Sequence, residues 1–444
     1  MSVMKKNISK VICLGAVLLS LTGCGNDAAE QTNATGQTEP VLKENTITYR
    51  LLEEPELTYE VPELIPGLCV PSGGYDVSEE KIAHVYGKIL PEEFFLLDRE
   101  SGEVVYTGAF SEVKYHKDTT SYSAVADFTE VAETGEYVLQ CDYLGHSYPF
   151  TVKERLQETA LVEMVTGFSE MFSSEGELQS KVDGALILLL SYDFYEESYE
   201  TEAGQIPQVL QVVHTYVETL MEELKKEEEQ SYDPYMMVAL LSKYGNCYQA
   251  FDWNKGNDAL KLAKNLWKEA EKKEESSDYR ILAASELYKA TGTYSYRKLV
   301  QEYFDAQLEA GEVLKSRNEV LAALTHFTTD YKVNRSLCTS LMEEILDQAE
   351  EVYSYIVLDN QLLSMGAGEE KLDEIMWNMV TVSVVEYVIT NYEYGDLLEE
   401  EYFYLQGRNP QAYDYVNEMI VKSPRMQAAY VMLLCEHLAH DHLK

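Results

Sequence analysis

The hydrophobic pattern of this 444-residue chain changes character near Lys153. Before this point, short apolar stretches alternate with polar residues and are separated by turn dipeptides such as Ser101-Gly102. After it, apolar residues recur every three or four positions, and the turn dipeptides typical of hairpins disappear. A period of two residues is that of a strand, and a period near 3.6 is that of a helix. The sequence therefore predicts a β domain followed by a helical domain.

The β domain is expected over residues 46–153. In EEFFLLDRESGEVVYTGAF, Ser101-Gly102 lies between two apolar runs, a typical hairpin signal. Two further runs, YSAVADFTEV and GEYVLQCDYLGHSYPFTV, have turn signals at Thr134-Gly135 and Leu144-Gly145. Several short strands joined by glycine-containing turns over about 100 residues indicate a β-sandwich.

The helical domain, residues 154–444, is expected to consist of six consecutive hairpins. Such hairpins suit either a closed toroid or an open solenoid, and the lack of a fixed repeat period disfavours the solenoid. Ser277-Asp278 is a typical amino cap for one helix, and Gly292 is a typical carboxyl cap. The expected pairs are 156–173 with 180–196, 206–228 with 234–251, 256–273 with 278–291, 295–309 with 317–329, 335–358 with 370–391, and 395–406 with 424–440.

The first 45 residues indicate export and anchoring. Residues 1–23 contain three lysines and an apolar run too short to span a bilayer, as in a signal peptide. The run ends in LTGC, which resembles a bacterial lipobox, so Cys24 is the expected lipid-attachment residue. An ordinary signal cut near this point, leaving a soluble protein, is the alternative. Residues 24–45 lack apolar periodicity and predict a flexible tether, so we expect a lipid-anchored protein at the bacterial cell surface, facing outside the cytoplasm.

Charge and cysteine content exclude several functional classes. The net charge of −42 opposes contact with phosphate backbones, so no nucleic-acid partner is expected. The five cysteines beyond Cys24 are scattered without metal-ligand spacing and predict free thiols. The sequence has no phosphate-binding glycine loop, and we expect neither a metal nor a cofactor.

Several stretches of the chain resemble family 9 glycoside hydrolases, which are cellulase-like enzymes. AASELYKATGTYSYRKLVQEYF (283–304) resembles the family's AAAELYRATGD stretch, and IPQVLQVVHTYVETLMEEL (206–224) is similar to its IPDLLDEARWELEWLLKMQ helix. LQGRNPQAYDYV (405–416) resembles LLGRNPLGQSYV, a loop beside the family's sugar-binding cleft. The β half is similar to the immunoglobulin-like domain that precedes many of these catalytic domains. The resemblance implies an immunoglobulin-like β-sandwich followed by an (α/α)6-type barrel of six hairpins.

The residues that would supply the catalytic base in this family are missing. Inverting glycosidases need a carboxylic acid and a carboxylate base on opposite sides of the scissile bond. The family's base lies in a GGWHDAGDYGKY loop before a helix that corresponds here to KVDGALILLLSYDFY (181–195). The preceding residues here are FSSEGELQS, in which Glu175 and Glu177 are the nearest carboxylates. A shorter loop with these glutamates is not expected to position the water.

Some of the residues that the resemblance assigns to the general acid and to sugar binding are present in this sequence. Asn417-Glu418 resembles the beginning of the family's NEVAIDYNAALV motif, in which the glutamate is the general acid, so Glu418 is a weak candidate for that role. Three extra residues before the following helix leave a chance match as the alternative. By the same resemblance, the candidate substrate-binding residues are Arg408, Asn409, Tyr413 and Tyr415.

Two further groups of residues have competing interpretations. His437 and His440 are spaced to bind a metal on a helix face, although a solvated carboxyl terminus explains them more simply. Trp253, Trp267 and Trp377 fall inside expected helices, where packing in the core explains them better than sugar binding.

These observations define three hypotheses for function. The first is a surface lipoprotein whose family-9-like barrel has lost hydrolytic activity and binds or handles a polysaccharide such as a β-glucan. The second is a divergent endoglucanase or other glycosidase with relocated carboxylates, and the third is a protein-binding scaffold. The missing base loop separates the first hypothesis from the second. An open aromatic cleft near residues 405–418 would separate the first from the third.

Overall fold

The structure is a computed structural model that describes residues 65–117, 119–199, 204–226, 232–358, 369–389 and 392–441. The expected signal peptide, the tether and Cys24 lie outside the described residues. No described helix is long and apolar enough to cross a membrane.

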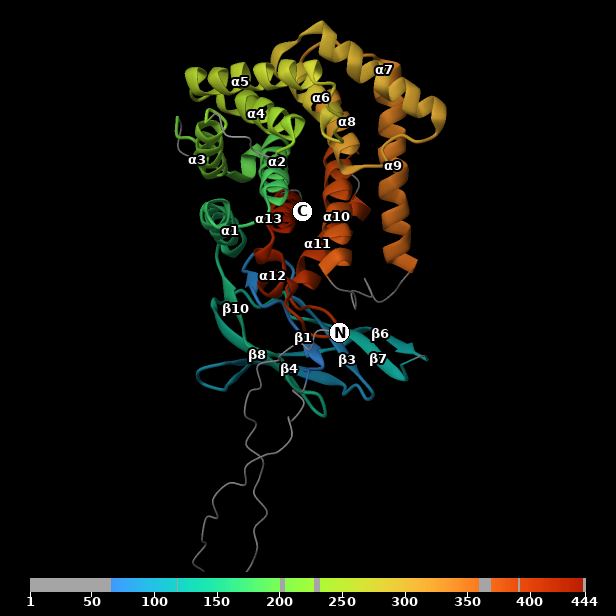
Figure 1. Cartoon of the computed structure of the whole chain (residues 1–444). Coiled ribbons are helices and arrows are strands. Elements are labelled where there is room, and N and C mark those ends of the chain that lie inside the picture. Colours follow the sequence, from blue (N-terminus) through green and yellow to red (C-terminus); the bar gives the residue numbers. More distant parts are fainter. Residues whose placement is uncertain are drawn as a thin grey trace, which may run out of the picture. The chain divides into compact units, whose positions relative to one another are not determined.

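Two β-sheets form the expected sandwich (Figure 1). One sheet has the strand order β1-β3-β7-β6, and the other has the order β2-β10-β8-β4-β5, with β9 paired to β8. All neighbouring strands are antiparallel except β2 and β10, which are parallel. The strands are β1 (Leu68–Cys69), β2 (Tyr75–Asp76), β3 (Ile82–Gly87), β4 (Glu93–Asp98), β5 (Val104–Ala109), β6 (Ser111–His116), β7 (Ser121–Asp127), β8 (Gly135–Cys141), β9 (Gly145–His146) and β10 (Phe150–Lys153).

The core of the sandwich follows from strand alternation. In β3, Ala83 and Val85 are fully buried, while the residues between them are partly exposed. Phe94 and Leu96 of β4 show the same alternation in the other sheet. Each strand therefore places one face in the core and the other toward solvent. The turn after Ser101 is also as expected, because Gly102 adopts the positive φ of 70° that glycine tolerates best.

All six expected helical hairpins are present. Their boundaries differ from the sequence prediction by a few residues, and the four-residue helix α12 was not predicted. The helices are α1 (Leu156–Ser173), α2 (Leu178–Phe194), α3 (Gln208–Glu223), α4 (Pro234–Tyr248), α5 (Trp253–Lys272), α6 (Arg280–Thr291), α7 (Tyr294–Ala310), α8 (Arg317–Phe327), α9 (Arg335–Leu358), α10 (Glu369–Ile389), α11 (Tyr392–Leu405), α12 (Tyr415–Glu418) and α13 (Pro424–Asp441), with short 3-10 helices at Glu196–Tyr199 and Ile420–Lys422.

The hairpins form an inner and an outer layer of helices. Nearly every residue of α4 is buried, whereas α5 buries only one stripe, which includes Ala259, Ala263 and Trp267. In the inner layer, α13 packs against α2 and α10, and α4 packs against α2 and α6, which in turn packs against α8. Figure 1 shows α5 and α7 running outside α4, α6 and α8. This arrangement is the expected six-hairpin barrel, with α2, α4, α6, α8, α10 and α13 as its inner helices.

The sandwich and the barrel share a buried polar contact. Glu79, just before β3, accepts hydrogen bonds from Gln157 of α1 at 3.0 and 3.1 Å and contacts His437 Nε2 of α13 at 3.1 Å. Asp76 of β2 accepts a bond from the Leu156 backbone N–H at 2.8 Å and so supplies the amino cap that the Arg155 side chain does not. The two parts are therefore joined by specific hydrogen bonds as well as by a short connection.

Candidate functional site

The amino ends of the inner helices form the end of the barrel where the family resemblance places catalysis. The helix that corresponds to the one after the family's base loop is α2, and the helix that ends the family's acid motif is α13. An ion pair of 3.4 Å between Asp183 and Arg425 joins the beginnings of these two helices. The two segments that the resemblance assigns to catalysis therefore meet in space.

Four charged side chains form a closed network at this end of the barrel. Arg425 Nε and Nη2 donate to the two carboxylate oxygens of Asp373 at 2.8 and 3.0 Å. Arg317 Nη2 lies 2.8 Å from Asp373 Oδ2, and the Tyr279 hydroxyl donates to Asp183 Oδ1 at 2.6 Å. Two carboxylates and two guanidinium groups from α2, α8, α10 and α13 thus neutralise one another.

The network determines the charge states of its members. Burial raises the pKa of Asp183, although the bond from Tyr279 and the charge of Arg425 oppose this rise. Burial acts on Asp373 as well, but hydrogen bonds from Arg317 and Arg425 outweigh it and hold the pKa of Asp373 below its usual value. Arg425 is the second residue of α13, where the helix dipole disfavours a cation. The two aspartates therefore stabilise an arginine that its own helix does not.

Two cavities lie on either side of the amino end of α8. One has a volume of about 630 Å³ and is lined by Tyr235, Tyr303 and several carboxylates. The other has a volume of about 710 Å³ and lies between α8, α9 and α10, with Arg317 and Trp377 in its wall. Both volumes are in the range of small-molecule binding sites. This end of the barrel therefore combines accessible cavities with a neutralised ion network.

The comparisons with known proteins match both parts of the chain. The family model described as the cellulase N-terminal ig-like domain matches residues 68–146, which span β1 to β9. A metagenome-derived glycoside hydrolase family 9 endoglucanase matches with a TM-score of 0.62 at 16% identity, over 78% of this chain and 84% of that one. The chain has a family 9 glycoside hydrolase fold.

Two further structures share this family-9-like fold. A family 9 glycoside hydrolase from Bacteroides ovatus matches with a TM-score of 0.61 at 15% identity, over 84% of this chain and 99% of that one. A thermostable endoglucanase from Alicyclobacillus acidocaldarius matches with a TM-score of 0.59 at 12% identity, over 79% and 84% of the two chains. No curated protein sequence matches the chain. The order of an immunoglobulin-like sandwich followed by a six-hairpin barrel, expected from the sequence, is confirmed.

The carboxylates singled out in the sequence lie apart from the network of the family-9-like barrel. Glu175 and Glu177 are exposed in the connection between α1 and α2. Glu418 ends α12 with 61% of its side chain exposed, and its carboxylate lies 3.8 Å from Lys422 Nζ. Its hydrogen bonds and ion pairs within the described chain connect it neither to Asp183 nor to Asp373. A general-acid role for Glu418 stays a prediction.

The loop LQGRNPQAYDYV packs the barrel against the sandwich. Arg408 is 2% exposed, and its guanidinium lies 2.9 Å from Glu400 and stacks over the Phe403 ring at 4.5 Å. The amide of Asn409 is fully buried: its Nδ2 donates to the carbonyls of Tyr404 and Tyr413, and its Oδ1 accepts from two backbone N–H groups. Because all these partners are in the protein, the contacts of Asn409 are those of a loop-stabilising residue.

The two tyrosines of this loop pack on each other. The rings of Tyr413 and Tyr415 meet edge to face at 4.7 Å, and Tyr415 stacks near Tyr404 at 6.3 Å. Tyr415 is buried and Tyr413 is half-buried. The backbone N–H of Ser72 in the sandwich donates to the Gln406 carbonyl at 2.8 Å. The loop therefore contributes to the contact between the two domains, and a role of these residues in substrate binding stays a prediction.

Two interpretations from the sequence were wrong, those of His437 and Trp253. His437 is only 2% exposed and bonds to Glu79, so it is neither solvated nor free to bind a metal. Trp253 is 65% exposed and so lies outside the core, whereas Trp267 is buried and the half-buried Trp377 packs against the core beside a cavity. In the described part of the chain, no three His, Cys, Asp or Glu side chains gather in a way that could hold a metal ion. The five cysteines of that part are free thiols, and four are buried.

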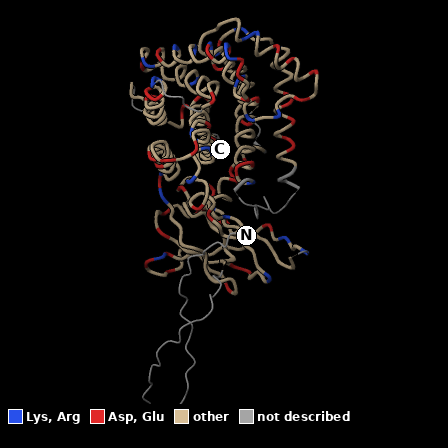
Figure 2. The backbone as a smooth tube through the Cα atoms, in the orientation of Figure 1, with Lys and Arg blue, Asp and Glu red and all other residues tan. Residues whose placement is uncertain are grey.

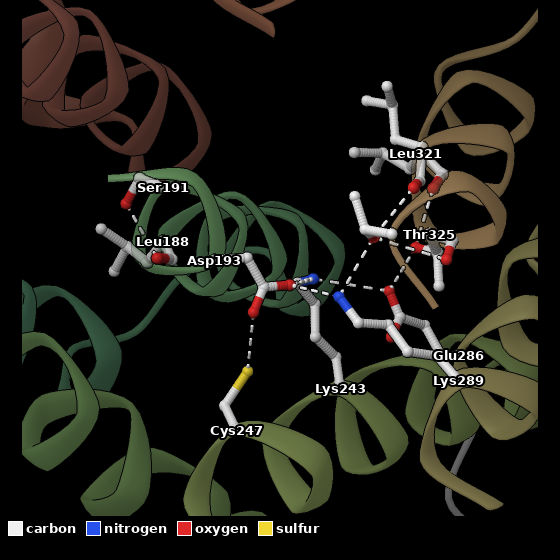
Figure 3. Close-up of polar contacts among 11 residues, drawn as sticks. Leu188, Ser191, Asp193, Lys243, Cys247, Glu286, Lys289, Leu321 and Thr325 are labelled. Carbon is white, nitrogen blue, oxygen red and sulfur yellow. Dashed lines mark hydrogen bonds and ion pairs between the residues drawn. The ribbon is translucent and has the colours of Figure 1, made fainter. Parts of the chain in front are cut away.

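The opposite end of the barrel carries a second ion network, shown in Figure 3. Lys243 Nζ of α4 lies 2.7 Å from Asp193 of α2 and 3.6 Å from Glu286 of α6, and Lys289 Nζ lies 3.0 Å from Asp193. Thr325 of α8 donates to Glu286 at 2.7 Å. These residues lie near the carboxyl ends of their helices, where cations are favoured by the helix dipoles. None of the cavities described above reaches this network, which holds four inner helices together.

The sequence analysis missed the central residues of the amino-end network. Asp183, Arg317, Asp373 and Arg425 lie near the starts of four largely apolar helices, and other charges stand close to the first three in the sequence. A charge near the start of a buried helix is a usable signal, because burial of such a group requires a partner. The signal cannot identify that partner, which here lies on another helix far along the chain.

Proposed function

We propose that this protein is a surface lipoprotein that binds polysaccharide through a family-9-like barrel without hydrolysing it. The observation that carries the proposal is the network of Asp183, Arg425, Asp373 and Arg317 at the barrel end where the resemblance expects an acid and a base. The two carboxylates there are bound to arginines that belong to the protein.

The chemistry of hydrolysis explains why this network disfavours turnover. An inverting glycosidase keeps its two carboxyl groups about 6.5–9.5 Å apart, with room for a sugar and a water between them. Arg425 contacts both Asp183 and Asp373 and thereby occupies the space between the two carboxylates. Asp373 is a weak base, because its bonds to Arg317 and Arg425 stabilise its charged form and lower its pKa. Glu418 is exposed and paired with Lys422, so it does not supply a second group there.

Binding is supported by the cavities at the same end. Tyr235 and Tyr303 line one cavity and Trp377 lines the other, and each cavity also has polar side chains that can bond to hydroxyl groups. The similar structures include endoglucanases, one of them described in complex with a cellobiose-like isofagomine. Glucan is therefore the first ligand to test.

The test compares binding and turnover in one preparation of the full chain in detergent. We expect retention on a β-glucan gel and no release of reducing sugar from carboxymethyl cellulose, mixed-linkage glucan or xyloglucan. Glu418→Gln should behave as the wild type in both assays. Release of sugar that disappears in Glu418→Gln would overturn the proposal and make Glu418 the acid of a divergent glycosidase. A failure to bind any glycan would favour the protein-binding scaffold.

Anchoring through Cys24 is part of the proposal and has its own test. The basic first residues, the short apolar run and LTGC together indicate a lipid-modified cysteine. Cys24→Ser should move the protein from the membrane fraction to the soluble fraction, because the acyl chains attached at Cys24 would supply most of its membrane affinity. Tight membrane association of the Cys24→Ser variant would contradict this.

A further inference from the structure

We propose that the cavity between α8, α9 and α10 binds a saccharide that carries a carboxylate, with Arg317 bonding to the carboxylate and Trp377 packing against the sugar ring. The inference rests on the proposed function and names the class of glycan. It depends on the shape of the cavity, the free donors of Arg317 and the charge of the lining.

The cavity is large enough for a sugar ring and its neighbours. Its volume is about 710 Å³, and its lining comes from the amino ends of α8 and α10 and from the side of α9. Trp377 supplies an aromatic face, and Gln348 and Asn378 supply amides. An aromatic surface with a few convergent polar groups is the usual composition of a small-molecule site.

Arg317 is held in place while part of its guanidinium stays free. Its Nη2 donates to the Asp373 carbonyl at 3.2 Å and lies 2.8 Å from Asp373 Oδ2. Its guanidinium carbon lies 5.4 Å from the centre of the Trp377 ring. Since the hydrogen bonds of Arg317 to described residues all use Nη2, the Nε and Nη1 donors remain for a ligand. The Nε–H and Nη1 donors point to different sides of the guanidinium, so each can donate one charge-assisted bond to a carboxylate oxygen.

The charge of the lining favours an anion in this cavity more than elsewhere. Lys315 and Lys371 face Glu351 and Glu374 in the wall, and Asp373 balances the charge of Arg317, so the lining is close to neutral. In the whole chain, by contrast, 77 acidic residues outnumber 35 basic ones, and acidic residues occur along the backbone of both parts of the structure (Figure 2). A lining close to neutral in so acidic a protein admits a negative ligand more readily than the acidic surface around it.

The cavity on the other side of α8 has an excess of acidic residues in its lining. Its lining contains two basic residues, Arg280 and Lys315, and five acidic ones: Glu271, Glu274, Glu275, Asp278 and Glu319. A carboxylated sugar is therefore admitted more readily on one side of α8 than on the other. The contrast predicts which of the two cavities an acidic residue of a glycan enters.

The test uses two trisaccharides that differ only in their carboxylates: α-1,4-trigalacturonate and the same trisaccharide with its carboxyl groups reduced to alcohols. Calorimetry with the full chain in detergent should show binding of the acid form at least about tenfold tighter, because hydrogen bonds to a charged group are worth about 1.5–3 kcal/mol. Rising salt should weaken the acid form and leave the reduced form unchanged. Equal affinities for the two forms would overturn the inference.

Variants locate the site within the chain. Trp377→Leu should weaken both trisaccharides, and Lys371→Gln should weaken only the acid form, by up to about fivefold. The matched control is Lys261→Gln, whose lysine is 63% exposed on α5 and lines neither cavity; it should change nothing. Circular dichroism confirms that each variant is folded. Binding of the acid form that is unaffected by Trp377→Leu and Lys371→Gln would place the site elsewhere and overturn the inference.

Glycan gels separate this inference from the proposed function. Retention on neutral glucan without binding of trigalacturonate would leave the proposed function standing and overturn the inference alone. Binding of no glycan would overturn both. If the protein binds trigalacturonate at Trp377 but also hydrolyses a neutral glucan, the proposed lack of hydrolysis is wrong. The carboxylate site would still stand.

Discussion

The two ends of the barrel carry ion networks of similar composition in very different surroundings. At the carboxyl ends of the inner helices, the side chains of Lys243 and Glu286 are 4% and 2% exposed. At the amino ends, the side chains of Arg317 and Arg425 are 32% and 30% exposed and lie near cavities. Each network has two acids and two bases, so charge balance alone does not distinguish a structural site from a functional one. The exposure of the side chains to solvent distinguishes the two sites.

The helix dipoles explain a second difference between the two ends. Lysines at carboxyl ends are stabilised by the dipoles of their own helices, whereas Arg425 at an amino end is not. The cations of the carboxyl-end network are therefore stabilised by their own helix dipoles, whereas Arg425 of the amino-end network is stabilised only by pairing across helices. We therefore expect substitutions in the carboxyl-end network to lower the free energy of unfolding more than substitutions in the amino-end network.

The largest expected effect is that of Lys243→Met, which leaves Asp193 and Glu286 buried without their shared cation. Removal of one member of a buried ion network should lower the free energy of unfolding by about 3–5 kcal/mol. Chemical denaturation measures the change. Lys261→Met, at an exposed position on α5, should stay within about 0.5 kcal/mol of the wild type. A loss below about 1 kcal/mol for Lys243→Met would contradict a structural role for this end.

Acid pH should destabilise the same end through His326, a fully buried residue of α8. Burial, followed by the charge of Arg297, lowers the pKa of His326 from 6.5 to about 4. Between these values the unfolded chain takes up a proton that the folded chain does not, so the free energy of unfolding falls as the pH drops from 6.5 to 4. The full loss is about 3 kcal/mol at roughly 1.4 kcal/mol per pKa unit.

The pH effect is measured as the difference between two curves. Denaturation of the wild type and of His326→Gln at pH 7, 6, 5 and 4 should show a shallower decline in the variant. His84, whose pKa is also lowered to about 4 by burial, contributes equally to both curves and cancels. Parallel curves would show that His326 does not titrate in this window.

A smaller effect is expected for Arg425→Gln at the amino end. The change removes the bonds to Asp373 and Asp183, but water can reach these partly exposed groups, so we expect a loss of about 1–2 kcal/mol. Arg425→Lys keeps the charge and should lose about half as much. Denaturation measures both variants, and a loss as large as that of Lys243→Met would remove the contrast between the two ends.

The smallest effect is expected for Arg280→Gln, near the amino end of α6. Its ion pair with Glu271 has side chains that are 40% and 38% exposed, and such surface pairs contribute about 0.5 kcal/mol. The same denaturation series measures it. A loss above about 1.5 kcal/mol would mean that exposure is a poor guide to the importance of these pairs.

The sequence predicted the six hairpins because their signal is local. A helix that faces a core repeats its apolar residues every three or four positions, and such a pattern is visible in α5 with its stripe of Ala259, Ala263 and Trp267. The short helix α12 was missed because four residues are too few to show a period. Trp253 was assigned to the core since it falls at a helix, but it is the first residue of α5 and lies outside the buried stripe.

The site was predicted less well, because its residues meet only in three dimensions. Arg408 and Asn409 attracted attention through a motif, yet they bond to Glu400 and Tyr404 of the barrel itself. Asp373 and Arg425 were passed over since each is an ordinary charge in its own segment, and the two are 52 residues apart along the chain. Spacing in the sequence does not reveal such a pair.

The sequence by itself determined the order of a β domain and a helical domain, the number of hairpins and the loss of the base loop. These properties depend on periodicity and on the presence of particular residues, both of which are readable along one dimension. The tertiary structure decided which charges face each other, which end of the barrel is open and that the GRNP loop packs against the sandwich. Those outcomes depend on distances between residues far apart in the chain, and on burial, which the packing of the whole protein sets.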